Sequence, residues 1–293
     1  MRWRSLIAKL STMTGKTPET YRAPALFLPH GGGPMPLLND PGHRDLITFL
    51  TKTGRKYLNP RPKAILLVTA HWETRNPTVS TVSKPELLYD YYNFPPETYN
   101  IDFPAKGDPE VAKRVVTLLQ NAGFKTQTDA ERGWDHGVFV PLKLYLPDFD
   151  IPIIPMSVLT SQDAAEHYRI GKALEPLRNE GVMIIGSGMS FHNMRAMRGR
   201  LGFSGTLNEP FDDAVDEAVK IASSDERGKV LSAWDKMEGA LDSHPYGAAE
   251  HFMPLLVVAG AGGDEPGVRA LSWNMSPFRI SAWVWEGATK GTA

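Results

Sequence analysis

Three of the eight histidines in the sequence follow short apolar runs. They are His30 after 25–29, His71 after 64–70, and His192 shortly after 182–188. Short apolar runs bounded by Gly or Pro are typical of buried strands. In open α/β sheets, ligands bind beyond the C-terminal ends of the strands. Three imidazoles delivered to that edge indicate a metal site or an acid–base site.

Two further histidines stand next to carboxylates. His136 follows Asp135 just before an expected helix, where it is a candidate donor to a substrate oxygen or an acid–base group. His251 follows Glu250 near the start of a helix apolar enough to be buried, so both polar side chains need partners or a metal. Neighbouring residues on a helix point about 100° apart. One of Glu250 and His251 can therefore face a metal while the other supports it.

The candidate metal ligands are thus His30 and His71 together with Glu250 or His251, and the candidate catalytic residues are His192 and His136. Two His and one carboxylate would leave three open positions, as in non-haem Fe(II) sites that bind a substrate and O₂. Coordination by His alone would suit Zn with a bound water. The residue types do not choose between the two metals.

Composition excludes several other kinds of site. The chain has no cysteine, so thiolate nucleophiles, disulfides and Cys-ligated metals are excluded. The Gly-rich segment His30-Gly31-Gly32-Gly33-Pro34 can turn sharply, but it lacks the phosphate-loop and dinucleotide-binding patterns. No Gly-x-Ser-x-Gly of an α/β-hydrolase is present. A formal net charge of −1 with no basic stripe predicts no nucleic-acid partner, and no apolar run predicts a membrane span.

The remaining histidines and three cations are given simpler or secondary roles. We interpret His43 and His167 as solvated on polar helix faces, and His244 as a loop residue. The candidates to pair with a substrate carboxylate are Arg75, Arg132 and Lys143.

Alternating strands and helices predict an α/β fold in a single domain, with a central, mostly parallel mixed sheet, helices on both faces, and the metal site at the C-terminal edge of the strands. Strands are expected at 25–29, 64–70, 124–128, 152–158, 182–187, 269–274 and 278–285, with the last two antiparallel. Helices are expected at 41–57, 108–122, 138–146, 162–179, 208–222, 226–237 and 246–259. Asp108 and Ser161 are candidate N-caps, and Gly123 and Gly181 suit helix C-termini.

Three segments fall outside this regular pattern. We expect a flexible N-terminal tail at 1–22, a catalytic domain at 23–286 and a C-terminal tail at 287–293. Residues 1–18 carry four cations and no acid, a composition weakly similar to a transit peptide. Without such targeting, a cytoplasmic location is expected. The chain could form a homo-oligomer. The loop at 84–106 is rich in Tyr, Phe and Pro, and long loops of this kind are often functional.

Taken together, five motifs in order resemble the class III extradiol ring-cleavage dioxygenases, in the 4,5-DOPA extradiol dioxygenase-like branch. The resemblance covers nearly the whole chain after Arg22. The motifs are Leu28-Pro29-His30-Gly31-Gly32-Gly33-Pro34-Met35, Thr69-Ala70-His71-Trp72-Glu73, Gly133-Trp134-Asp135-His136-Gly137 with Val140-Pro141-Leu142, Ser187-Gly188 with His192-Asn193, and Glu250-His251-Phe252 with Pro254-Leu255. The chain departs from the branch in having His-Gly-Gly-Gly-Pro where His-Gly-Ser-Pro is usual, which puts the substrate's identity in doubt.

The resemblance implies an enzyme that opens the ring of a catechol-type substrate, DOPA-like or related, with O₂. It implies Fe(II) in the active form, with Zn(II) sometimes present in purified protein. His30 and His71 would be ligands, and the third would be Glu250, as in protocatechuate-type relatives, or His251, as the DOPA-like branch favours. His192 would handle protons, with a fourth-ligand role left open, His136 would contact substrate or oxygen, and the aromatic loop would act as a lid. Two alternatives remain open: a non-catalytic Memo-type metal-binding protein and a Zn-dependent hydrolase on the same fold.

Overall fold

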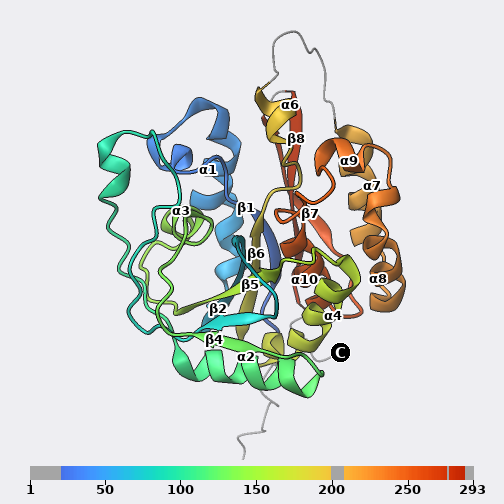
Figure 1. Cartoon of the computed structure of the whole chain (residues 1–293), viewed down its shortest axis with the longest axis horizontal. Coiled ribbons are helices and arrows are strands. Elements are labelled where there is room, and N and C mark those ends of the chain that lie inside the picture. Colours follow the sequence, from blue (N-terminus) through green and yellow to red (C-terminus); the bar gives the residue numbers. More distant parts are fainter. Residues whose placement is uncertain (1–20, 199–207, 276, 288–293) are drawn as a thin grey trace, which may run out of the picture.

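The computed structural model describes residues 21–198, 208–275 and 277–287, and it forms one α/β unit around an eight-stranded sheet (Figure 1). The strands are β1 Ala25–Pro29, β2 Ala64–Thr74, β3 Thr78–Ser80, β4 Gln127–Asp129, β5 Ile153–Leu159, β6 Val182–Gly188, β7 Val268–Met275 and β8 Phe278–Trp285. Their spatial order is β4-β3-β5-β2-β6-β1-β8-β7. The predicted tails at 1–22 and 287–293 fall mostly outside the described residues.

The sheet is parallel at its centre and mixed at its edges. β2 pairs in parallel with β5 and β6, and β1 pairs in parallel with β6. β8 runs antiparallel to both β1 and β7, which confirms the expected antiparallel end of the sheet. Because β1, β2 and β6 are parallel neighbours, their C-terminal ends meet at one edge.

Helices cover both faces, as the fold prediction requires. The α-helices are α1 Arg44–Thr51, α2 Pro109–Asn121, α3 His136–Tyr145, α4 Ala164–Leu174, α5 Pro176–Asn179, α6 Met194–Arg198, α7 Glu209–Val219, α8 Ser224–Ser232, α9 Ala240–Ser243 and α10 Met253–Ala261. Short 3₁₀ segments lie at Met35–Leu38, Pro41–His43, Thr53–Leu58, Pro96–Tyr99 and Trp234–Lys236. None of the helices in the described part is long and apolar enough to cross a membrane.

The alternation of side chains along the central strands divides the core in two. Leu26 and Leu67 pack with residues of α1 and α3 on one face. Phe27 and Leu66 pack with residues of α2, α4, α7 and α10 on the other. Figure 1 shows α1 and α3 on one side of the sheet and α4, α8 and α10 on the opposite side. The sheet is therefore buried on both faces, which explains why its central strands are almost uninterrupted apolar runs.

Local signals placed several element ends correctly and missed others. Asp108 caps α2 by accepting hydrogen bonds from the Glu110 and Val111 amides, and Gly123 and Gly181 have φ of +88° and +84° after helices. Ser161 is not the cap of α4, because Asp163 accepts from the Glu166 amide at 2.8 Å and the helix starts at Ala164. The helix expected at 246–259 begins only at Met253, with turns before it.

Candidate active site

Five histidines converge beyond the C-terminal ends of the central strands. His30 follows β1, His71 lies near the end of β2, and His192 comes four residues after β6. The other two are His136, the first residue of α3, and His251, two residues before α10. The sheet edge thus gathers all five of the imidazoles that the sequence selected.

The imidazoles are closely packed. The ring centroids of His30 and His71 are 4.8 Å apart, and the His251 ring lies 5.1 Å from His30 and 4.8 Å from His71. His136 lies 3.9 Å from His71, and His192 stacks on His251 at 3.5 Å. His30 is fully buried and His251 is 4% exposed. The group forms one compact, largely buried cluster.

Each candidate ligand has an oxygen partner near its Nδ1 atom. His30 Nδ1 lies 3.1 Å from Ser187 Oγ, and the Ser187 hydroxyl donates to the Gly137 carbonyl. His71 Nδ1 lies 3.6 Å from Asp90 Oδ2. His251 Nδ1 lies 2.8 Å from Glu250 Oε1. Metal-bound imidazoles are commonly held this way, with the second ring nitrogen fixed by an oxygen acceptor.

The nitrogen geometry fits a metal ion. His30 Nε2 and His71 Nε2 are 3.2 Å apart, and two nitrogen ligands at about 2.1 Å from one ion lie roughly 3.0–3.4 Å apart. Potential ligand atoms also group within 4.8 Å in two sets, His30 with His71 and His136, and His192 with Glu250 and His251. The donor set of imidazoles with a nearby carboxylate is typical of Zn and non-haem Fe sites.

Electrostatics keep the cluster in the form that binds metals. Burial lowers the pKa of His30 and of His251 well below the usual range for histidine, and neighbouring imidazoles lower each further. Burial, with the effect of His136, lowers the pKa of His71 to about 3, although Asp90 acts in the opposite direction. The rings are therefore neutral near pH 7, and neutral imidazole is the ligand form.

Asp90 is a site residue that sequence reasoning missed. It lies in the aromatic loop, where its Oδ1 accepts from the His136 backbone amide at 3.0 Å and lies 2.8 Å from His136 Nδ1. Burial raises the pKa of Asp90, but its contacts with His136 outweigh this and hold the pKa below its ordinary value. No motif marked Asp90 in the sequence, because the same loop holds other carboxylates and the contact with His136 spans 46 positions of the chain.

The three proposed carboxylate-binding cations do not line the cavity next to the imidazoles. Arg132 is directed into the protein, where it donates to the His71 carbonyl and to Asp135 Oδ2, both at 3.1 Å. Lys143 donates to the Asp102 carbonyl, and Arg75 is exposed. Asp135 stands at the N-cap of α3, but its side chain accepts from Thr69 and Arg132 rather than from the helix. Of these cations, Arg132 supports the segment that carries His71.

His43 and His167 are buried, which corrects their interpretation as solvated residues. The helix expected at 41–57 is broken, and His43 packs against Trp273 at 4.9 Å instead of facing water. His167 lies on the face of α4 that meets β5, where its Nε2 accepts from the Leu159 amide at 2.9 Å. His244 is also buried, with its Nε2 2.9 Å from the Ser190 carbonyl oxygen.

His43 supports the glycine loop after His30. Its Nε2 accepts from the Gly32 amide at 3.0 Å, and its Nδ1 lies 2.6 Å from Asp40 Oδ2. Gly31 has φ of +84°, and a Cβ there would lie 2.7 Å from Pro36 and 2.9 Å from His43. The loop can therefore pass this close to His43 only with glycine at that position.

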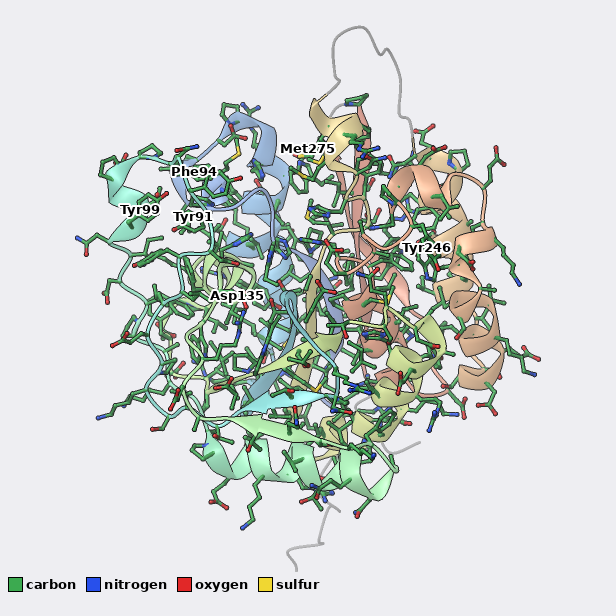
Figure 2. All side chains as sticks on the ribbon, viewed as in Figure 1. Tyr91, Phe94, Tyr99, Asp135, Tyr246 and Met275 are labelled. Carbon is green, nitrogen blue, oxygen red and sulfur yellow. The ribbon has the colours of Figure 1, made fainter. Side chains whose placement is uncertain are left out.

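A cavity of about 800 Å³ opens next to the imidazole cluster. Its walls come from the glycine loop, the aromatic loop, the segment after β6 and the end of β7. The residues that line it include His30, His71, His136, His192 and His251 together with Tyr91, Phe94, Met194 and Met275. Figure 2 shows Tyr91 and Phe94 on the aromatic-loop side and Met275 on the side of β7 and α6. The cavity gives a small molecule direct access to the imidazoles.

Comparison with known proteins agrees with this arrangement. Residues 24–284 match the family described as the catalytic LigB subunit of aromatic ring-opening dioxygenase. A protein named dioxygenase tasH from Hapsidospora irregularis is 43% identical over 279 residues, covering 91% of this chain and 86% of that protein. Proteins named 4,5-DOPA dioxygenase extradiol are also similar. Those from Beta vulgaris and Escherichia coli K12 are each 38% identical, over 82% and 85% of this chain and 87% and 89% of theirs.

A solved structure shares the fold. The crystal structure of an uncharacterized Escherichia coli K12 protein aligns with a TM-score of 0.68 and 33% sequence identity. The alignment covers 90% of this chain and 99% of that one. The predicted single-domain α/β fold is thereby confirmed.

Proposed function

We propose that this chain, which belongs to the family of catalytic LigB-type subunits of aromatic ring-opening dioxygenases, opens the ring of a catechol with O₂ at the imidazole cluster. The observation that carries the proposal is the grouping of five imidazoles, most of them buried, at the floor of a cavity large enough for an aromatic diol. Family membership fixes the class of reaction, and the cluster supplies the groups that such a reaction needs.

We assign His30, His71 and His251 as metal ligands. The paired Nε2 atoms of His30 and His71 and the oxygen partner near each Nδ1 support this assignment. Glu250 then acts on His251 rather than on the ion, because its Oε1 lies 2.8 Å from His251 Nδ1. An Fe(II) ion bound there would supply Lewis acidity toward the diol and open positions at which substrate and O₂ meet.

The other two histidines would handle protons and orient the substrate. His192 lines the cavity and its side chain is 21% exposed, so it can reach a substrate hydroxyl, accept its proton and later return it. His136 is oriented by Asp90, whose Oδ1 lies 2.8 Å from its Nδ1, and this leaves Nε2 for a contact with substrate. The loop carrying Asp90, Tyr91 and Phe94 covers one side of the cavity and would help to exclude water.

The test is reconstitution with Fe(II) under nitrogen, followed by O₂ admission with a panel of catechols. We expect O₂ uptake equal to substrate loss and a new visible absorbance from the ring-opened product. His192→Gln should retain the metal and lose turnover, whereas His71→Ala should lose both. Absence of turnover with every catechol, or O₂-independent hydrolysis with Zn(II), would refute the proposal.

A further inference from the structure

The cavity above the imidazoles has walls of thioethers and aromatic rings. Five methionines line it, namely Met35, Met189, Met194, Met197 and Met275, together with Tyr91, Tyr92 and Phe94. At the imidazole end His30, His136 and His251 are buried, whereas Met194 is 45% exposed and Tyr92 is 78% exposed. The cavity therefore runs from a closed imidazole floor to an open apolar mouth.

The carboxylates of this cavity already have hydrogen-bond partners. Among the described side chains of 21–197, 208–275 and 277–287, its lining contains two carboxylates and neither Lys nor Arg. Asp40 lies 2.6 Å from His43 Nδ1, and Asp90 lies 2.8 Å from His136 Nδ1. An anionic substituent bound here would meet these two carboxylates and no cation among the described side chains, and a buried charge without a partner is costly.

The cavity is also larger than a single ring requires. Its volume of about 800 Å³ is near the upper end of the range typical of sites for drug-sized ligands. Methionine side chains are flexible and polarizable, so they adapt to bulky apolar groups and contact aromatic rings favourably. Figure 2 shows Tyr91 and Phe94 at the left and Met275 nearer the centre of the molecule, and all three line this cavity. A substituent on the ring would lie between these two walls.

We propose that the substrate is a catechol with a bulky, uncharged, apolar substituent, and that catechol acids and catechol amino acids are poor substrates. This inference rests on the proposed function for the site, but it concerns the cavity walls rather than the imidazoles. It distinguishes this chain's preference from the amino-acid substrate that the names of several relatives suggest.

The test compares 3-(3,4-dihydroxyphenyl)propionate with its methyl ester, which carry the same ring and differ in charge. With Fe(II)-loaded protein we expect kcat/KM for the ester to exceed that for the acid by at least about tenfold, since only the acid brings a negative charge against thioether and aromatic walls and beside Asp40 and Asp90. DOPA should behave like the acid. An equal or higher kcat/KM for the acid or for DOPA would overturn the inference while leaving the dioxygenase assignment intact.

A binding measurement tests this inference independently of ring opening. Calorimetry on Zn(II)-loaded protein under nitrogen should show tighter binding of the ester than of the acid. If no catechol is turned over, the proposed function fails, and the binding preference alone then decides whether the cavity selects uncharged groups. Equal affinities would overturn the inference.

A charge placed at the mouth gives a second test. Met194→Lys adds an ammonium group where Met194 is exposed, and we expect it to reduce the ester-to-acid ratio of kcat/KM. Met194→Leu removes the thioether without adding charge and should retain the ratio of the unmodified protein. An unchanged ratio in Met194→Lys would contradict the placement of the substituent at the mouth.

Discussion

Glu250 Oε1 lies 2.8 Å from Nδ1 of His251, the residue that follows it in sequence. The same oxygen lies 3.5 Å from His192 Nδ1, so one carboxylate touches both a candidate ligand and the candidate proton carrier. Burial raises the pKa of Glu250, but its contact with His192 and a backbone hydrogen bond outweigh burial and hold the pKa below its ordinary value. Glu250 is therefore charged near neutral pH and suited to orient both rings.

This contact predicts different results for substitutions at the two neighbouring positions. Glu250→Gln keeps a hydrogen-bond acceptor for His251 but removes the charge, so we expect metal affinity to fall by about 10–100-fold. His251→Ala removes a ligand and should abolish stoichiometric metal binding, as should His71→Ala. Chelator competition with metal analysis measures both effects. Complete metal loss in Glu250→Gln with retention in His251→Ala would make Glu250 the ligand instead.

The sequence brought the candidate site residues together because its histidines follow strand-like runs. His30, His71 and His192 could be placed at one sheet edge because neighbouring parallel strands end together. The contribution of His251 could not be resolved in the same way. The turn before α10 sets its direction, and a helix was expected there, so sequence spacing left Glu250 and His251 equivalent.

The residues that the sequence did not explain depend on long-range contacts. Asp90 meets His136 across 46 positions of the chain, and no local pattern reports such a contact. The prediction that His43 is solvated on a polar helix face was wrong, because the 3₁₀ turn at Pro41–His43 directs its ring toward Trp273 of β7. Arg132 was a candidate to bind a substrate carboxylate, but the buried carboxylate of Asp135, three residues away, already binds it.

Asp90→Asn should separate the orientation of His136 from metal binding. The amide can no longer accept strongly from both the backbone and the ring of His136, so we expect kcat to fall by roughly tenfold or more. Metal content should change less, because Asp90 lies 3.6 Å from His71 Nδ1 but only 2.8 Å from His136 Nδ1. Steady-state kinetics with metal analysis provides the measurement.

Asp102→Asn is the matched control for that experiment. Asp102 lies in the same loop and is exposed, and its backbone carbonyl rather than its side chain accepts from Lys143. The Asp102→Asn variant should keep kcat close to that of the unmodified protein. Equal losses in both variants would show that the loop's net charge matters and not the contact with His136.

His43→Leu should loosen the glycine loop beside His30. The substitution removes the acceptor of the Gly32 amide and leaves Asp40 without its partner, so we expect a loss of about 1–3 kcal/mol in the free energy of unfolding. Asp40→Asn keeps the imidazole in place and should cost less. Urea denaturation of the two variants measures the difference, and full stability of His43→Leu would contradict the supporting role of His43.

His167 should make stability depend on pH in mildly acidic solution. Burial lowers its pKa from 6.5 to about 4, although contacts with Asp163 act in the opposite direction, and the neutral ring accepts from the Leu159 amide. A histidine whose pKa is lower in the folded state stabilises the protein fully above pH 6.5, and this contribution is lost as the pH falls toward 4. The loss should approach about 1.4 kcal/mol per pH unit, or roughly 3 kcal/mol in all. Below pH 4 this residue should add no further change.

The measurement is the free energy of unfolding from urea titrations between pH 7 and pH 4. His167→Gln cannot gain a proton, so its stability should fall less steeply over this interval, although it starts lower at pH 7. His244, whose pKa burial lowers to about 3, is present in both proteins and cancels in the comparison. Because His167 bonds to Leu159 and Asp163 rather than to the imidazole cluster, adding or removing metal should leave the difference between the two slopes unchanged. Identical slopes for both proteins would show that His167 is protonated in the folded state at these pH values.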